Sequence, residues 1–104
     1  AVKKVFGDSP ILCSSTKPMT GHTLGAAGAL ETAVCFESIY MNRGKPSEQI
    51  RLPVHLWDGI YDDEFPRLNF AGPDSIAKKV NVCMSSSFAF GGANACLVIG
   101  EKID

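Results

Sequence analysis

The arrangement of apolar and small residues along the chain predicts a strand, a helix and a terminal pair of strands. Residues 11–15 form a short apolar run after Pro10, which predicts a buried strand. Residues 23–43 are rich in alanine and leucine and are followed by Gly44, a pattern typical of a helix and its C-terminal stop. The polar residues of this helix do not gather on one face, so we expect a core helix that is buried on most sides.

Residues 44–78 hold four of the six prolines and are expected to form a long surface loop, with a short edge strand near Leu68–Phe70. A loop of this length is usually functional or binds a partner. Within it, we interpret the acidic group at 62–64 as a solvated turn and His55 as a packing or surface histidine rather than a metal ligand.

Residues 79–101 predict an antiparallel hairpin. Val80, Val82 and Met84 alternate with more polar residues, and a second apolar strand follows at 94–100 after a glycine-rich turn. The order of elements is strand, helix, strand, strand, which indicates the α/β class.

Composition narrows the classes of function. The chain has 104 residues, of which 45% are apolar and 20% charged, as expected for one small globular domain. The net charge of −1 and the lack of a basic block argue against nucleic acid and anionic membranes as partners. The longest apolar stretch contains Glu31 and Glu37, so no membrane span is expected. The four cysteines form no Cys-x-x-Cys pair, and we expect free thiols in a reducing, cytoplasmic setting.

The first candidate for chemistry is the turn from Lys17 to His22, between the predicted strand and helix. Ligands usually bind in α/β proteins at the carboxyl ends of strands. We expect His22 at the N-terminus of the helix, where the macrodipole favours a neutral imidazole that can donate to a developing oxyanion. Lys17 supplies a positive charge that could pair with Glu31. From these residues alone, a solvated Lys17 and a merely capping His22 remain open.

The second candidate is the glycine-rich turn at 88–94. Gly91 and Gly92 free the backbone to adopt positive φ. A phosphate-binding loop is disfavoured because a strand, not a helix, follows the glycines. Phe88 and Phe90 instead suggest an apolar substrate wall on a hinged loop. We expect neither a metal ion nor another cofactor.

These two segments together resemble a known family. Ser14–Glu31 resembles the Lys…Gly-His segment of β-ketoacyl-[acyl carrier protein] synthases, and Ser87–Ala95 resembles their Gly-Phe-Gly-Gly-x-Asn loop. Leu52–Gly59 further resembles the ketosynthases of bacterial aryl-polyene clusters. The resemblance implies an α/β fold, namely the C-terminal part of a thiolase-like fold with a strand, a buried helix and an antiparallel terminal hairpin. Because the chain also begins without methionine, we expect a C-terminal fragment that is inactive alone.

The resemblance also implies a reaction. In this family a cysteine takes an acyl group from acyl carrier protein, and two histidines assist decarboxylation of malonyl-carrier protein. The resulting carbanion then attacks the acyl thioester. By similarity, His22 would be the second histidine and would stabilise the enolate, and Lys17 would be the supporting lysine, paired with Glu31. The nucleophilic cysteine and the first histidine have no counterpart in this chain.

The glycine-rich turn would be the gating loop of such an enzyme. The backbone N–H of Phe90 would contribute to the oxyanion hole while its ring gates the acyl pocket. Phe88, Gly91 and Gly92 would form the rest of the gate, and Asn94 would brace it by hydrogen bonds.

The chain departs from the family pattern at two positions of this loop. Ala89 stands where a glycine is usual, which predicts a stiffer gate, and Ala93 stands where a threonine is common.

The implied partners are acyl carrier protein and a second subunit, in a homodimer or heterodimer. Two rival interpretations stay open. One is a non-catalytic partner subunit, similar to a chain-length factor, that shapes the acyl tunnel. The other is a free-standing small binding module.

Overall fold

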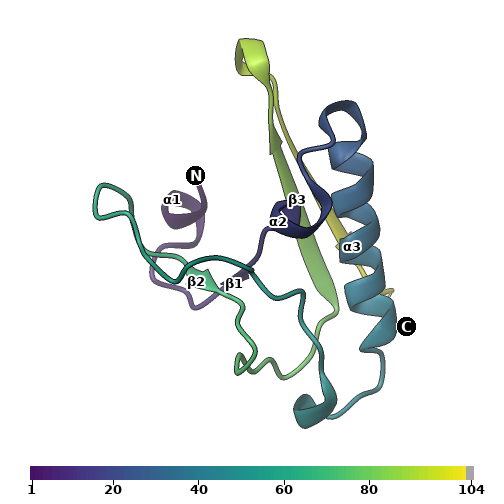
Figure 1. Cartoon of the computed structure of the whole chain (residues 1–104). Helices are drawn as coiled ribbons and strands as arrows, with labels where there is room; N and C mark the ends of the chain where they lie inside the picture. Colours follow the sequence, from purple (N-terminus) through teal and green to yellow (C-terminus); the bar gives the residue numbers. More distant parts are fainter. Residues whose placement is uncertain (103–104) are drawn as a thin grey trace. The chain divides into compact units, whose positions relative to one another are not determined.

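The computed structural model describes residues 1–102 and divides the chain into two compact units (Figure 1). The first unit contains residues 1–21 and 53–75, and the second contains residues 22–52 and 76–102. The stretch 44–78, expected to be a single loop, is therefore shared between the two units.

The first unit is built around a short parallel pair of strands. β1 (Leu12–Cys13) pairs with β2 (Asn69–Phe70), with Leu12 opposite Asn69. After β2, the backbone N–H of Ala71 donates to the carbonyl of Cys13 at 2.8 Å, and the carbonyl of Ala71 accepts from the N–H of His55 at 2.7 Å. The chain around residue 55 therefore continues the hydrogen bonding of the pair. Two short helices, α1 (Val2–Phe6) and α2 (Lys17–Thr20), complete the unit.

Aromatic side chains order the proline-rich stretch of this unit. The rings of His55 and Phe70 stack with centroids 4.2 Å apart, and Trp57 lies 5.0 Å from Phe70 in an edge-on contact. Tyr61 packs edge-on against Trp57 at 4.9 Å, and the guanidinium of Arg67 lies 4.6 Å from the Tyr61 ring centroid. Such contacts stabilise beyond the area they bury. The interpretation of His55 as a packing histidine is confirmed.

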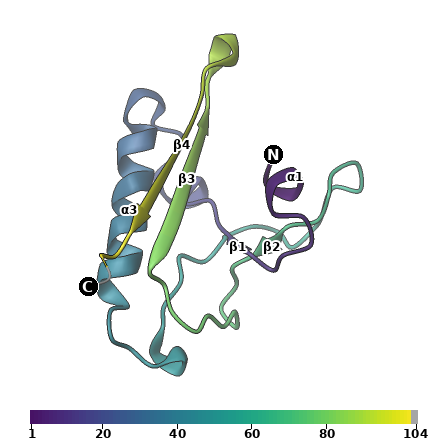
Figure 2. The same ribbon diagram turned by 180° about the vertical axis from the view of Figure 1, so that it is seen from behind.

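The second unit consists of a helix packed against a hairpin (Figure 2). Two short 3₁₀ turns, η1 (Leu24–Ala26) and η2 (Ser47–Gln49), flank α3 (Ala27–Met41) in the sequence. β3 (Val82–Phe88) and β4 (Asn94–Gly100) pair antiparallel, and η3 (Phe90–Gly92) lies in their connection. The predicted combination of helix and strands with an antiparallel terminal hairpin is confirmed.

Small side chains separate α3 from β3. A Cβ atom at Gly28 would lie 3.9 Å from the hydroxyl of Ser87, which is ordinary van der Waals contact. Further along, the thiols of Cys35 and Cys83 interact across the same interface. Gly28, near the start of the helix, thus faces Ser87, near the end of the strand, whereas Cys35, later in the helix, faces Cys83, earlier in the strand. The helix α3 therefore runs antiparallel to β3.

The helix differs from expectation in its start and its burial. It begins at Ala27 rather than at residue 23 because Leu24 has a φ of 52°, which no α-helical residue adopts. Within residues 1–102, the buried residues of α3 are Ser38 and Ile39, and Phe36 and Tyr40 are 55% and 61% exposed. The expectation of burial on most sides is thus not met in the described chain, because the hairpin covers one face of the helix.

Asn42 ends α3 and ties it to the segment that follows. The residue is 4% exposed, and its side-chain amide donates to the carbonyls of Ser38 at 2.7 Å and Arg51 at 2.8 Å. Its side-chain oxygen accepts from the N–H of Arg51 at 2.8 Å. Beside it, Arg43 pairs with Glu101 at 2.7 Å. None of the helices within residues 1–102 has the length and apolar character needed to cross a bilayer.

Candidate functional site

The turn that carries Lys17 is closed by its own backbone hydrogen bonds. The carbonyl of Thr16 accepts from the N–H groups of Met19 at 2.9 Å and Thr20 at 3.0 Å. The hydroxyl of Thr20 donates to the same carbonyl at 3.2 Å, and the N–H of Gly21 donates to the carbonyl of Lys17 at 2.8 Å. Gly21 then leaves the turn with a φ of 78°, a region that favours glycine. Residues 16–21 therefore form one compact piece of backbone.

His22 follows this turn and is exposed at the start of the second unit. We expected it at or next to the helix N-terminus, but η1 stands between His22 and Ala27, the first residue of α3. The macrodipole acts within the first turn of a helix, so the effect of the helix dipole that we predicted for His22 does not follow from this geometry. Among residues 1–102, Leu24 is the one non-glycine residue with positive φ, so a strained backbone follows the histidine closely.

Lys17 and Glu31 belong to different units. Lys17 begins α2 in the first unit, and Glu31 lies on α3 in the second. The ion pair between them stays a prediction.

The glycine-rich loop closes the β3–β4 hairpin. Ala89 donates its N–H to the carbonyl of Ala93 at 2.7 Å, so the loop proper is residues 89–93. Gly91 and Gly92 have φ values of 79° and 82°, which explains the need for glycine at both positions. Phe90 is 99% exposed at the tip of this loop. Its ring is therefore exposed, and its role as a gate stays a prediction.

The ends of the loop are fixed by the strands. Phe88 is the last residue of β3 and lies opposite Asn94, the first residue of β4. Phe88 is 65% exposed, and Asn94 is exposed as well. The bracing role of the Asn94 side chain stays a prediction.

The second unit brings the segment after His22 and the glycine-rich loop to one end. Figure 2 shows the hairpin turn and the N-terminal end of α3 at the same end of the unit. The contact between Gly28 and Ser87 places the first turn of α3 beside the last residues of β3. The segment that follows His22 and the glycine-rich loop therefore lie at one end of the helix–hairpin layer.

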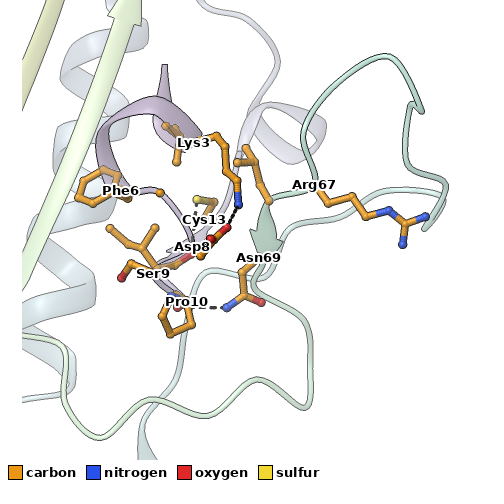
Figure 3. A pocket seen from close by; sticks show the side chains of 12 residues that line it. Lys3, Phe6, Asp8, Ser9, Pro10, Cys13, Arg67 and Asn69 are labelled. Carbon is orange, nitrogen blue, oxygen red and sulfur yellow. Dashed lines mark hydrogen bonds and ion pairs between the residues drawn. The ribbon is translucent and has the colours of Figure 1, made fainter.

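A small cavity lies in the first unit, away from these motifs along the chain. Its volume is about 170 Å³, and residues of α1 and of the segments around β1 and β2 line it (Figure 3). Lys3 forms an ion pair and hydrogen bond with Asp8 there, which lowers the pKa of the Asp8 carboxyl. Asn69 donates its side-chain amide to the carbonyl of Pro10 at 3.2 Å. The cavity contains none of the predicted site residues.

The cysteines lie as free thiols in the structure. Burial raises the pKa of the Cys13, Cys35 and Cys83 thiols. The negative charge of Glu31 raises that of Cys35 further. A raised pKa keeps a thiol protonated and unreactive near neutral pH, so none of these three resembles an activated nucleophile.

Sequence reasoning missed the contact between His55 and Ser15, which precedes the Lys17 turn. The Nδ1 atom of His55 accepts a hydrogen bond from the N–H of Ser15 at 3.0 Å. The two residues are 40 positions apart, and no local pattern predicts such a contact. The nearest signal is the aromatic content around His55, which indicates packing but not the partner.

Comparisons with known proteins support the family resemblance. Residues 1–50 match the family described as "Beta-ketoacyl synthase, C-terminal domain". The chain is 41% identical over 106 residues to 3-oxoacyl-[acyl-carrier-protein] synthase 2 of Coxiella burnetii, a match that covers 100% of the chain and 23% of that protein. It is 34% identical over 104 residues to 3-oxoacyl-[acyl-carrier-protein] synthase 1 of Escherichia coli K12, with the same two coverages of 100% and 23%.

A third relative bears a different name. The chain is 37% identical over 103 residues to Nodulation protein E of Rhizobium meliloti, covering 97% of the chain and 23% of that protein. No solved structure matches the chain significantly. The chain thus spans 23% of the length of these three relatives. The matches over its whole length, together with the mixed helix–hairpin structure, show that the chain belongs to the β-ketoacyl synthase family, whose C-terminal domain has the thiolase-like fold.

Proposed function

We propose that the full-length protein carrying this chain is a condensing acyltransferase. It joins an enzyme-bound acyl group to the two-carbon unit of malonyl-acyl carrier protein, with loss of CO₂, and yields a 3-oxoacyl-acyl carrier protein. The observation that carries this proposal is the hydrogen-bonded turn at residues 16–21, which contains Lys17 and leads into His22. It occurs in a chain that is 41% identical to a 3-oxoacyl-[acyl-carrier-protein] synthase.

In this reaction His22 stabilises charge that develops on the substrate. When malonyl thioester loses CO₂, the electron pair left on carbon delocalises onto the thioester oxygen. An imidazole N–H aimed at that oxygen lowers the barrier because the charge exists in the transition state and not in the ground state. The exposure of His22 fits an approach by substrate from outside the chain. Lys17, paired with Glu31, supplies the nearby positive charge.

The glycine-rich loop serves the acyl substrate. The N–H of Phe90 donates to the oxyanion formed on the acyl thioester, and its ring gates the acyl pocket together with Phe88. The positive φ values at Gly91 and Gly92 support this role because they let the backbone turn and present amides without side-chain obstruction. Asn94 braces the loop at its C-terminal end.

The substrates reach the site on acyl carrier protein, which is the partner that the proposed reaction requires. We further propose a cytoplasmic homodimer or heterodimer that works in fatty-acid or polyene/polyketide synthesis. The similarity of Leu52–Gly59 to aryl-polyene ketosynthases favours a polyene product.

A condensation assay tests the proposal. The full-length protein is incubated with an acyl-carrier protein and carboxyl-labelled malonyl-carrier protein, and both labelled CO₂ and the 3-oxoacyl product are measured. We expect the full-length protein to form both products and the Lys17→Ala variant to form less of them. Lys45→Ala is the matched control, since Lys45 is an exposed lysine outside the motifs. A protein that forms neither product alone, but changes the product length of an added catalytic ketosynthase, would instead be a non-catalytic partner subunit.

A further inference from the structure

His55 lies against the start of the turn that carries Lys17. Its Nδ1 atom accepts the N–H of Ser15 at 3.0 Å, and the hydroxyl of Ser15 accepts the N–H of Lys17 at 3.4 Å. A side chain from the proline-rich stretch therefore contacts the backbone two residues before Lys17.

The ring of His55 is held in place from two sides. It stacks on Phe70 at a centroid distance of 4.2 Å and an interplanar angle of 11°, and it lies 5.5 Å from the ring of Trp57. The backbone N–H of His55 donates to the carbonyl of Ala71 at 2.7 Å. Rotating the ring away from Ser15 would break the stacking on Phe70, so Nδ1 is a preorganised acceptor.

This acceptor fixes the point where the chain leaves β1. The strand ends at Cys13, so the N–H of Ser15 lies beyond its ladder, and the backbone N–H of this half-buried residue needs a partner. Residues 16–21 are closed by their own hydrogen bonds. The bond at Ser15 therefore restrains the point where the backbone enters this turn, and with it the position of the Lys17 backbone from which the side chain extends.

We propose that His55 is a positioning residue for the condensation reaction, which aims Lys17 through the backbone of Ser15. The inference rests on the proposed function, because it requires Lys17 to take part in the reaction. In this role His55 contacts no substrate. Its contribution lies in the accepting nitrogen, whereas the stacking of its ring contributes to stability.

Two substitutions separate these contributions. His55→Phe keeps a ring against Phe70 but removes the acceptor, and His55→Asn supplies an acceptor near the Nδ1 position but removes the ring. We expect His55→Phe to fold and to lower kcat by roughly tenfold to a hundredfold with KM for malonyl-carrier protein unchanged, the scale of a small misplacement of a catalytic group. We expect His55→Asn to lower the Tm more and kcat less. If kcat instead follows Tm, with His55→Asn the less active variant, the role is structural and the proposal is overturned.

A double variant tests the route through Lys17. If His55 acts by aiming this lysine, Lys17→Ala combined with His55→Phe loses no more activity than Lys17→Ala alone. Multiplying losses would show that His55 acts elsewhere and would overturn the positioning role, with the proposed function intact. A full-length protein without condensation activity would contradict the proposed function. An unaffected Lys17→Ala variant would contradict the role of Lys17. The first outcome is measured on the unmodified protein and the second on the variant, so the two can be distinguished.

Discussion

Removing the Asn42 side chain should loosen the end of α3 and the segment that follows it. The side chain makes three hydrogen bonds, two as donor to Ser38 and Arg51 and one as acceptor from Arg51, and the residue is 4% exposed. A hydrogen bond contributes about 0.5–1.5 kcal/mol, and unmet partners in a buried place cost more, so Asn42→Ala should lower the free energy of unfolding of this region by about 2–4 kcal/mol.

The measurement combines urea unfolding of the full-length protein with hydrogen exchange at the Arg51 amide. Arg43→Ala is the matched control, because it removes an exposed ion pair with Glu101 one residue further on. Such a pair contributes about 0.2–1 kcal/mol, so the control should change stability little and leave the Arg51 amide protected.

A second substitution identifies the direction of the bonds. Asn42→Asp keeps an acceptor for the Arg51 N–H but turns a carboxylate oxygen toward the carbonyls of Ser38 and Arg51. The new carboxyl group is held protonated by this surrounding, so its pKa in the folded state lies above its unfolded value. The loss of stability should therefore be largest at neutral pH and smaller below about pH 4, where the unfolded state is protonated too. A cost for Asn42→Ala below about 0.5 kcal/mol, or a pH-independent cost for Asn42→Asp, would refute the described geometry.

Three further predictions concern the loop and the thiols. Gly91→Ala should lower local stability by about 1–2 kcal/mol, because the φ of 79° at Gly91 disfavours a side chain even though the space around it is open. Amide exchange in the hairpin measures this loss, and an unchanged exchange rate would contradict the left-handed turn. Ala89→Gly should speed exchange of the loop amides and broaden the range of acyl chains accepted, whereas unchanged product lengths would argue against a stiffened gate. Alkylation by iodoacetamide should modify the exposed Cys96 before Cys35 and Cys83. Cys35 and Cys83 should react faster as pH rises, since burial raises their pKa values. Equal alkylation rates for all three cysteines near neutral pH would contradict the protected environment of Cys35 and Cys83.

The local parts of the fold follow from sequence because their signals are local. The alanine- and leucine-rich segment predicts α3, and the paired glycines at 91 and 92 predict the hairpin connection. The start of α3 is displaced for a reason that composition does not reveal. Leucine and alanine favour helix, yet Leu24 adopts positive φ and a 3₁₀ turn follows before Ala27.

The structure of the first unit is harder to predict because it depends on contacts between residues that are distant in the sequence. The ring stack of His55 on Phe70 and the bond from Ser15 to His55 join segments with no shared periodicity. Proline-rich sequence without periodicity predicts a loop, and only tertiary contacts show that this loop is ordered. The same limit applies to the candidate site. Both motifs were found from sequence, whereas the support behind the Lys17 turn was not.

The central claim concerns His22, and malonyl decarboxylation measures its role most directly. The rate of labelled CO₂ release from malonyl-carrier protein is compared between the full-length protein and its His22→Ala variant, with folding checked by thermal unfolding. Loss of an oxyanion donor should lower this rate by about 10²–10³-fold without a change in Tm, because His22 is exposed. An unchanged rate of CO₂ release in the folded His22→Ala variant would contradict the proposed mechanism.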